Sequence, residues 1–298
     1  MIALYWRAIR GGFLTVSLVP VLLGAAVVRH DLHTPLLPAF PFVLLGAFCI
    51  HIGSNLWNDY ADDQNGADRA NRHPSPFSGG SRVIQDGSIT VAAVGRAAMI
   101  FFGAALFISL ILVCYRGWRV LLFTLAGLAC GLCYSSPPTW LNGRSLGEIT
   151  VGIAFGPLLA EGTVLALTGR MSLSVFWASV PLGILVASIL LLNGVPDLSS
   201  DLSVGKRTLA VRLGPVRALR LFRLMLAGTF LFMLVCAATG ILPRLTGIVL
   251  ILAPLGIWIC LLTGKLAAGL VRHYQPAALW TIILHLCFGL LITTAFWW

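Results

Sequence analysis

The amino-acid sequence predicts an all-α membrane protein with about nine transmembrane helices, and three observations support this fold class. Of its 298 residues, 58% are hydrophobic and only 10% are charged, whereas an ordinary soluble domain is roughly 25% charged. Long apolar runs recur along the whole chain. These runs do not alternate as strands would, and backbone groups in lipid must be satisfied within helices or closed barrels. We therefore expect a bundle of membrane helices.

The apolar runs predict the order of the helices. A helix needs about 20 apolar residues to cross a hydrocarbon core of ~30 Å. Runs of roughly this length lie at residues 12–29, 36–57, 91–114, 119–134, 148–168, 173–194, 221–240, 246–264 and 277–298. The first run is not closed by the small-residue cleavage site of a signal peptide, so we expect it to remain as a helix. We expect a single transmembrane domain over residues 1–298.

The basic residues predict how the bundle lies in the membrane, because Lys and Arg collect on the cytoplasmic side. If the N-terminus is cytoplasmic, fifteen of the twenty Lys and Arg residues lie on that side. This distribution predicts a multi-pass protein of the cell (inner) membrane with a cytoplasmic N-terminus. The net charge of +10 does not indicate nucleic-acid binding, since the charges flank spans instead of forming one basic stripe. They suit contact with membrane lipid headgroups.

The ten acidic residues are the main clue to function, because seven of them lie in two short segments. One segment follows the second apolar run and the other follows the sixth. The spacing Asn-x-x-x-Asp-x-x-x-Asp occurs in both, beginning at Asn55 and again at Asn193. The seven residues are Asp59, Asp62, Asp63, Asp68, Asp86, Asp197 and Asp201. The chain therefore carries one acidic motif twice.

Clustered carboxylates of this kind indicate a magnesium site. Carboxylates three and four residues apart on a helix repel one another, and a divalent cation relieves that repulsion. Mg²⁺ is usually held by one or two carboxylates together with phosphate oxygens of a substrate, so two facing clusters suit a diphosphate bridged by Mg²⁺. The alternative is that both clusters are solvated loop residues. The predicted metal ligands are Asp59, Asp62, Asp63, Asp68, Asp197 and Asp201.

Basic residues accompany both acidic segments. Guanidinium and ammonium groups beside Mg²⁺ would neutralise the charge that grows on a departing diphosphate. Arg82 and Lys206 are favoured because each follows a glycine-containing turn, where the backbone can approach a phosphate. Arg72 and Arg207 are further candidates. For each of these residues the alternative is a purely topological role.

Other polar residues carry weaker signals. The segment from Tyr134 to Glu148 contains prolines and small polar residues, so it is expected to be a loop on the same face as the acidic segments, or else an ordinary helix connection. Glu161 lies inside a span, where an acid is a functional candidate by default; the alternative is a hydrogen bond to a neighbouring helix. His51 and His285 are expected to be satisfied core histidines. The seven cysteines are expected to be small core residues.

These motifs resemble those of the UbiA superfamily of intramembrane prenyltransferases, most closely its 1,4-dihydroxy-2-naphthoate polyprenyltransferase branch. The resemblance rests on Asn58-Asp59-Tyr60-Ala61-Asp62 with Gly66 and Asp68, on residues 76–82, on Tyr134-Ser135 with Pro138, and on residues 197–214. It implies helices around a central cavity, cytoplasmic loops that cap the active site, and two Asp-rich segments that bind a prenyl diphosphate through Mg²⁺. The implied catalytic residues are Asp59, Asp62, Asp197 and Asp201. With the basic residues included, the expected diphosphate contacts are Asn55, Asn58, Arg72, Arg82, Tyr134, Asn193, Lys206 and Arg207.

The expected function is therefore Mg²⁺-dependent transfer of a polyprenyl group from an allylic polyprenyl diphosphate to an aromatic acceptor within the membrane. The resemblance implies 1,4-dihydroxy-2-naphthoate as the acceptor, in menaquinone biosynthesis. Transfer to 4-hydroxybenzoate or to another lipid or quinone precursor is the first alternative. A cation-coupled transporter is the second, although a transporter would place its ionisable residues near the bilayer midplane. The sequence leaves tail length and oligomeric state open.

Overall fold

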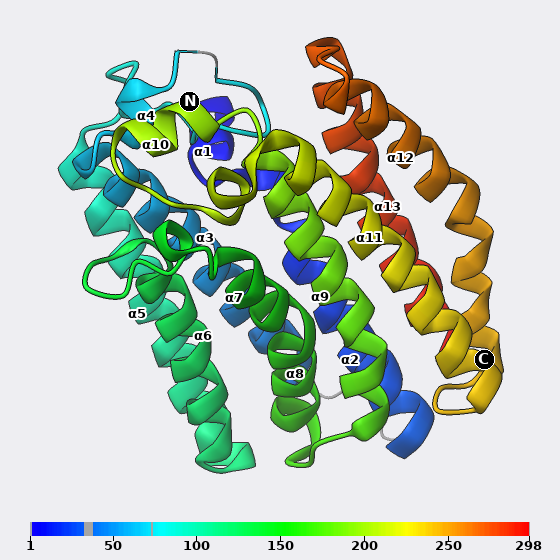
Figure 1. Cartoon of the computed structure of the whole chain (residues 1–298). Helices are drawn as coiled ribbons and strands as arrows, with labels where there is room; N and C mark the ends of the chain where they lie inside the picture. The colour runs from blue at the N-terminus through cyan, green and yellow to red at the C-terminus, as the bar shows by residue number, and fades with distance from the viewer. Residues whose placement is uncertain (1, 33–37, 73, 298) are drawn as a thin grey trace.

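The computed structural model describes residues 2–32, 38–72 and 74–297, and this part of the chain is built of helices without a strand (Figure 1). The α-helices are α1 (Ile2–Ala8), α2 (Thr15–Leu32), α3 (Ala39–Gln64), α4 (Ala67–Ala70), α5 (Val91–Arg116), α6 (Arg119–Ser135), α7 (Gly147–Ile153), α8 (Leu159–Thr168), α9 (Leu173–Asn193), α10 (Leu198–Ser203), α11 (Leu209–Thr239), α12 (Ala253–Ala267) and α13 (Tyr274–Ala295). Short 3₁₀-helices lie at η1 (Gly11–Phe13), η2 (Asn142–Arg144), η4 (Arg244–Leu252) and η5 (Val271–His273), and η3 (Ala154–Leu158) is a π-helix.

The predicted membrane helices are confirmed. Within the described ranges, eight segments are long and apolar enough to cross a membrane. Helix α6 is a ninth apolar helix of 17 residues, which at 1.5 Å per residue measures about 26 Å and falls slightly short of a typical hydrocarbon core. Each of the nine predicted runs coincides with one of these segments. The chain is therefore a multi-pass membrane protein.

Two helices are longer than their apolar runs. Helix α3 continues to Gln64, although the run ends at residue 57. Helix α11 begins at Leu209 instead of residue 221: the Thr208 hydroxyl caps it by accepting a hydrogen bond from the Val211 N–H at 3.3 Å, and Gly214, with φ 70°, then kinks it before the apolar run. Hydropathy detects only the turns that lie in lipid, so it misses helical turns that project beyond it. In α3 the projecting turns carry the first acidic segment.

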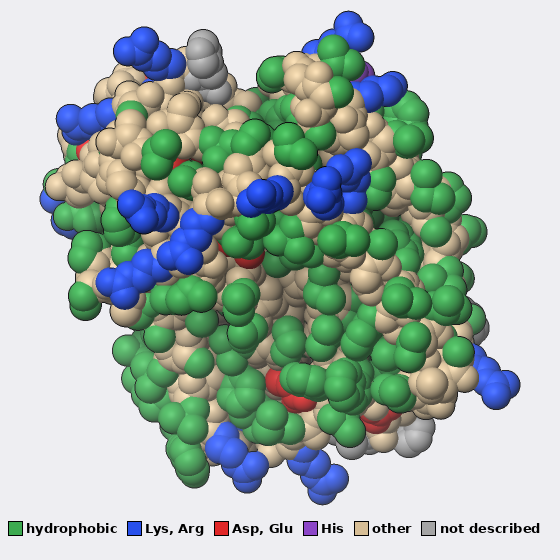
Figure 2. Space-filling model, in the orientation of Figure 1, with side chains coloured by type: hydrophobic (Ala, Val, Ile, Leu, Met, Phe, Trp, Pro, Cys, Tyr) green, Lys and Arg blue, Asp and Glu red, His purple; other side chains and the backbone are tan. Residues whose placement is uncertain are grey.

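The helices form a bundle with a capped end (Figure 1). Helices α1, α4 and α10 lie together at one end, where α4 contacts α10. Helices α11, α12 and α13 form one side of the bundle, α5 and α6 lie on the opposite side, and α2 packs against α8, α9 and α13 between them. Large exposed hydrophobic residues such as Phe107, Leu231 and Ile251 cover the outside. Figure 2 shows hydrophobic side chains across the middle of the visible face, with Lys and Arg mainly towards both ends, as membrane burial requires.

The helix from α7 to α8 is irregular and packs closely on α9. Residues 154–158 form the π-helix η3, and Gly156 departs from helical geometry with φ −106° and ψ −108°. A Cβ atom added at Gly156 would lie 2.8 Å from the Gly183 Cα of α9, so only glycine permits this approach. Small residues commonly let membrane helices pack this tightly. The π-helix places Ala154, Phe155 and Leu158 on the wall of an internal cavity.

Candidate active site

A cavity of about 1030 Å³ lies inside the bundle. Helix α3 lines it from Phe42 to Asp62, a distance of about 30 Å at 1.5 Å per residue. Its end near α4 and α10 carries the charged side chains, whereas its deeper part is lined mainly by apolar residues. The apolar lining includes Val43, Ala47, Ile108, Leu112, Val120, Phe123 and Leu159. The cavity therefore joins a polar end to a long apolar end.

The first acidic segment lies on the last turns of α3 and on α4. Asp62 and Asp68 both line the cavity and are 6% and 5% exposed. Burial raises the pKa of the Asp68 carboxyl to about 7, and the charges of Asp62 and Asp59 act in the same direction. The Asp68 Oδ2 atom is buried and has no hydrogen-bond partner in the described part of the chain. An unsatisfied buried acceptor of this kind fits a cation ligand.

The second acidic segment reaches the same end of the cavity from α9 and α10. Asp197 ends the turn after α9 and is the N-cap residue of α10, and Asp201 lies in α10; both line the cavity. The Asn71 amide donates to Asp197 Oδ1 at 2.8 Å, and the Gly79 N–H donates to Asp197 Oδ2 at 3.1 Å. Burial raises the pKa of Asp197 to about 6, and the nearby Asp201 charge adds to the effect. Asn71 and Gly79 thus hold this segment in place.

Lys206 joins the two acidic segments. Its Nζ atom lies 2.9 Å from Asp62 Oδ2 and 3.4 Å from Asp201 Oδ1. Burial alone would lower the pKa of this ammonium group, but Asp62 and Asp201 outweigh burial and raise it above its usual value. Residues 144 positions apart in the sequence therefore meet in one buried ion cluster. The sequence-based prediction that the two segments face each other is borne out in their geometry.

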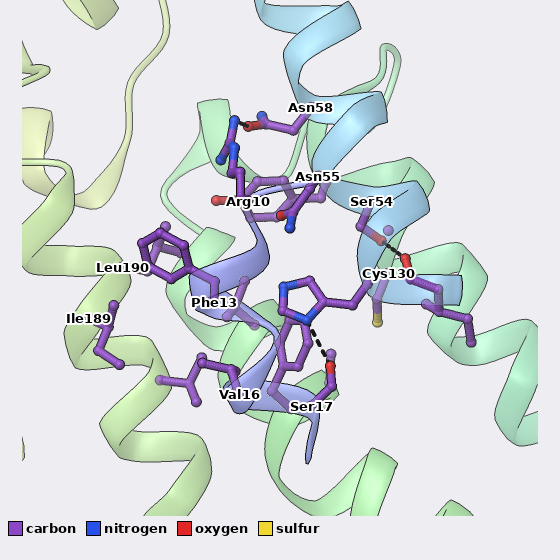
Figure 3. A pocket seen from close by; sticks show the side chains of 18 of the residues that line it. Arg10, Phe13, Val16, Ser17, Ser54, Asn55, Asn58, Cys130, Ile189 and Leu190 are labelled. Atoms are coloured by element: carbon purple, nitrogen blue, oxygen red, sulfur yellow. Dashed lines mark hydrogen bonds between the residues drawn. The ribbon is translucent and has the colours of Figure 1, made fainter. Parts of the chain in front are cut away.

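Arg10 is a site residue that sequence reasoning missed. Its guanidinium forms a hydrogen bond to Asn58 Oδ1 at 3.0 Å and an ion pair with Asp59, and Figure 3 shows it beside Asn58 and Asn55. The Ser81 hydroxyl also donates to Asp59. Arg10 stands just before the first span, where a basic residue is expected for topological reasons alone. No signal in the sequence distinguished it from the other arginines.

The structure brings most of the predicted site residues to the cavity wall. Asp59 lies just behind the wall, beneath Arg10 and Ser81. The segment predicted as a loop is partly helical: Tyr134 lies in the last turn of α6, Asn142 begins η2 and Glu148 lies in the first turn of α7. Asn142 and Glu148 also line the cavity. The predicted residues that line it are Asn55, Asn58, Asp62, Asp68, Arg82, Tyr134, Asn193, Asp197, Asp201 and Lys206.

Three predicted residues lie away from the cavity wall. Asp63 accepts hydrogen bonds from Arg69 at 2.9 and 3.0 Å and from Gln85 at 3.2 Å. Arg72 and Arg207 are exposed. The geometry therefore favours a structural role for Asp63, whose carboxylate is already paired.

The donor set fits magnesium. In the described ranges, no three His, Cys, Asp or Glu side chains converge closely enough to hold a metal by themselves. Mg²⁺ does not need such a cage, because it binds through one or two carboxylates, waters and substrate phosphates. Asp62 and Asp68 on one side and Asp197 and Asp201 on the other offer carboxylate oxygens at the polar end of the cavity. A dication there would also relieve the repulsion among them.

Comparison with known proteins agrees with this geometry. The UbiA prenyltransferase family matches residues 17–282. The 1,4-dihydroxy-2-naphthoate octaprenyltransferase of Bacillus subtilis is 27% identical over 235 residues, which cover 79% of this chain and 74% of that protein. The protein of the same name from Escherichia coli is 28% identical over 310 residues, with coverage of 96% and 91%.

A solved structure has the same fold. The UbiA homolog from Archaeoglobus fulgidus bound to GPP and Mg²⁺ superposes with a TM-score of 0.60 at 16% identity, covering 98% of this chain and 99% of that one. The family match extends over most of the sequence, and the helical bundle with its internal cavity agrees with it. This chain belongs to the UbiA prenyltransferase family and is a membrane-embedded transferase.

Proposed function

We propose that this enzyme transfers a polyprenyl group from an allylic polyprenyl diphosphate to 1,4-dihydroxy-2-naphthoate, with Mg²⁺ as its cofactor. One observation carries the proposal: carboxylates from two distant segments meet Lys206 at the polar end of a long apolar cavity. That arrangement suits a ligand with a diphosphate head and a hydrocarbon tail. The names of the relatives from Bacillus subtilis and Escherichia coli support the acceptor. The ligands of the Archaeoglobus fulgidus homolog support the diphosphate and Mg²⁺.

The residues at the polar end have separate tasks in this proposal. When bound, Mg²⁺ stabilises the negative charge that leaves with the diphosphate. Asp62, Asp68, Asp197 and Asp201 hold the cation, and Asp59 keeps Arg10 in position beside them. Lys206, Arg82 and Arg10 donate to diphosphate oxygens. Asn55, Asn58, Tyr134 and Asn193 contribute neutral polar contacts on the same wall.

The reaction balances without a redox partner. The bond between the allylic carbon and the diphosphate oxygen breaks, and its electron pair leaves with the diphosphate. A carbon of the electron-rich ring then forms a new bond to the allylic carbon. Where that ring carbon bears the carboxylate, CO₂ departs and leaves its electron pair to restore the aromatic ring. The apolar wall keeps water away from the allylic cation during this sequence.

We further propose that the active site faces the cytoplasm of a cell (inner) membrane protein. Helices α1, α4 and α10 share one end of the bundle. If that end is cytoplasmic, fifteen of the twenty Lys and Arg residues lie on the cytoplasmic side, in agreement with the positive-inside rule. A water-soluble acceptor and the released diphosphate would then exchange with the cytoplasm, while the tail enters from lipid.

The experiment is turnover of the purified full chain in detergent. Radiolabelled polyprenyl diphosphate is supplied with Mg²⁺ and a panel of acceptors that includes 1,4-dihydroxy-2-naphthoate and 4-hydroxybenzoate. We expect prenylation of the naphthoate with release of CO₂, and loss of turnover when EDTA replaces Mg²⁺. Transfer only to 4-hydroxybenzoate or another ring would overturn the proposed acceptor. Turnover that survives EDTA would overturn the proposed magnesium dependence.

A further inference from the structure

His51 is a buried polar residue of the cavity wall that the diphosphate chemistry does not use. It lies on α3, eight residues before Asp59, which places it about 12 Å farther along the helix. Its side chain lines the cavity although the residue is only 5% exposed. His51 therefore lies deeper in the cavity than the carboxylates. At this depth we expect the first carbons of the prenyl group or the acceptor that reacts with them. Its place in an apolar run predicted a satisfied core histidine, whereas the structure places His51 on the cavity wall.

Only one of the two imidazole nitrogens has a partner. Nδ1 lies 2.8 Å from the Ser17 hydroxyl of α2, and Ser17 is fully buried; the dashed line at Ser17 in Figure 3 marks this bond. In the part of the chain that the structure describes, no hydrogen bond reaches Nε2. A neutral imidazole has one donor and one acceptor nitrogen. Ser17 thus orients the ring and leaves Nε2 for a ligand.

Neighbouring polar side chains are already occupied. The Ser54 hydroxyl donates to the Ile50 carbonyl at 2.8 Å, and the Asn55 amide donates to the Ile9 carbonyl at 3.1 Å. A polar group left unpaired in an apolar cavity costs free energy until a ligand satisfies it. Besides the Ser109 hydroxyl on α5, which also lines the cavity and has no partner in the described part of the chain, His51 Nε2 is therefore a group of this wall that remains open to a ligand.

The walls beside His51 suit a flat ring. The Phe155 ring lies 4.7 Å from the His51 ring, centroid to centroid, and is carried by the π-helix η3. Phe13 and Val16 line the same region of the pocket (Figure 3). Aromatic walls bind planar ligands through favourable ring contacts, and π-helices recur at functional sites. The polyprenyl tail needs only the apolar lining that lies deeper.

We propose that His51, positioned by Ser17, donates a hydrogen bond to, or accepts one from, a ring hydroxyl of the aromatic acceptor and thereby sets the affinity and selectivity for that acceptor. This inference rests on the proposed function, because it assigns the acceptor half of the same cavity. His51 contacts the acceptor, and Ser17 is a positioning residue. Neither His51 nor Ser17 binds the diphosphate or the metal in this proposal.

The test is steady-state kinetics of full-chain variants, with each substrate varied in turn. His51→Leu is expected to raise the acceptor KM about tenfold, as loss of one hydrogen bond predicts, and to leave the KM for the polyprenyl diphosphate within twofold. His51→Asn, a shorter polar side chain that tests the same contact if the leucine variant does not fold, is expected to raise the acceptor KM similarly. His51→Gln is expected to restore the acceptor KM to within threefold of the wild type. Ser17→Ala should give an intermediate increase.

His285→Leu is the matched control. His285 is also a fully buried histidine, on α13, but it does not line the cavity. The His285→Leu variant should keep the KM values for the acceptor and for the polyprenyl diphosphate within twofold of the wild type. Two analogues, 1-hydroxy-2-naphthoate and 4-hydroxy-2-naphthoate, are then measured as competitive inhibitors. The analogue that lacks the contacted hydroxyl should bind wild type and His51→Leu equally, whereas the other should lose affinity in the variant.

The outcomes separate the two proposals. Absence of wild-type turnover with every acceptor would overturn the proposed function itself. Wild-type turnover with equal losses for both substrates, or with equal losses for both analogues, would overturn the acceptor role of His51. An acceptor KM that stays unchanged in both His51→Leu and His51→Asn would also overturn it.

Discussion

The two acidic segments have the same sequence spacing but different structures. In the first segment, Asn55, Asp59 and Asp63 stand on one uninterrupted helix, because α3 continues to Gln64. In the second, α9 ends at Asn193, and a turn containing Pro196 separates it from α10. Proline lacks the N–H needed to continue a helix, so the second segment folds into a turn. Equal spacing therefore does not produce equal geometry.

The two segments also differ in the charge of their partners. Asp59 and Asp62 of the first segment form ion pairs with Arg10 and Lys206. Asp197 of the second segment is held by neutral donors, the Asn71 amide and the Gly79 N–H. Burial consequently raises the pKa of Asp197 to about 6, since neutral donors offset the cost of a buried charge only in part. Each segment nevertheless shares Lys206, since Asp201 also lies 3.4 Å from its Nζ atom. In the first segment the Asp68 Oδ2 atom has no hydrogen-bond partner in the described part of the chain. Asp68 and Asp197, one from each segment, are therefore the carboxylates that depend most on an added cation.

Replacing Lys206 should give the largest effect because this residue joins both segments. Lys206→Met removes the ammonium group between Asp62 and Asp201. We expect kcat to fall about 100-fold to 1000-fold, as when a donor to developing negative charge is removed. The metal-free variant should also unfold at a lower temperature, because breaking a buried ion pair leaves carboxylates without compensation. Saturating Mg²⁺ should restore part of that stability.

Lys265→Met is the matched control for this change. Lys265 is the other lysine of the chain and lies in the last turn of α12, outside the cavity. Its replacement should leave turnover within twofold and the unfolding temperature nearly unchanged. If Lys206→Met kept wild-type turnover, the idea that Lys206 links the two segments at the active site would be wrong.

Much of the architecture could be predicted from the sequence because lipid imposes a simple rule. Each predicted apolar run coincides with an apolar helical segment, eight of which are long enough within the described ranges to cross a membrane, and the repeated acidic spacing correctly indicated that distant segments meet. Asp62 and Lys206, which were selected from their motifs, are in contact at 2.9 Å. Both results follow from patterns that a single chain displays locally.

The remaining features depend on packing that local patterns do not carry. Arg10 and Ser81 reach Asp59 only because residues before the first span and after α4 fold over the end of α3. The π-helix at Phe155 arises where Gly156 meets Gly183 on another helix. His51 belongs to the cavity because α2 supplies Ser17 opposite it. Such contacts between segments distant in the chain decide which of several similar residues is functional.

Replacing Asn71 tests the neutral hydrogen-bond donors that hold Asp197, and its effect should be smaller than that of Lys206→Met. Asn71→Ala removes the side-chain donor to Asp197 but leaves the Gly79 N–H in place. Loss of one hydrogen bond to a buried carboxylate predicts about a tenfold decrease in kcat/KM for the polyprenyl diphosphate. Kinetics with that substrate varied at saturating Mg²⁺ would measure it. If kcat/KM for the polyprenyl diphosphate fell as far in Asn71→Ala as in Lys206→Met, neutral and charged partners would matter equally here.

Asp63 should give the smallest effect, and it separates sequence spacing from geometry. By spacing it matches Asp201, and the motif predicts it as a metal ligand. In the structure its oxygens are taken by Arg69 and Gln85 on the side of α3 away from the cavity. Asp63→Asn should therefore reduce turnover less than threefold and change the unfolding temperature little, because Arg69 is exposed and pairs with an exposed partner are weak. Turnover and thermal unfolding of Asp63→Asn are compared with those of Asp62→Asn, which should lose at least about 100-fold in kcat. Equal losses in the two variants would show that the repeated spacing, and not the side-chain directions, identifies the ligands.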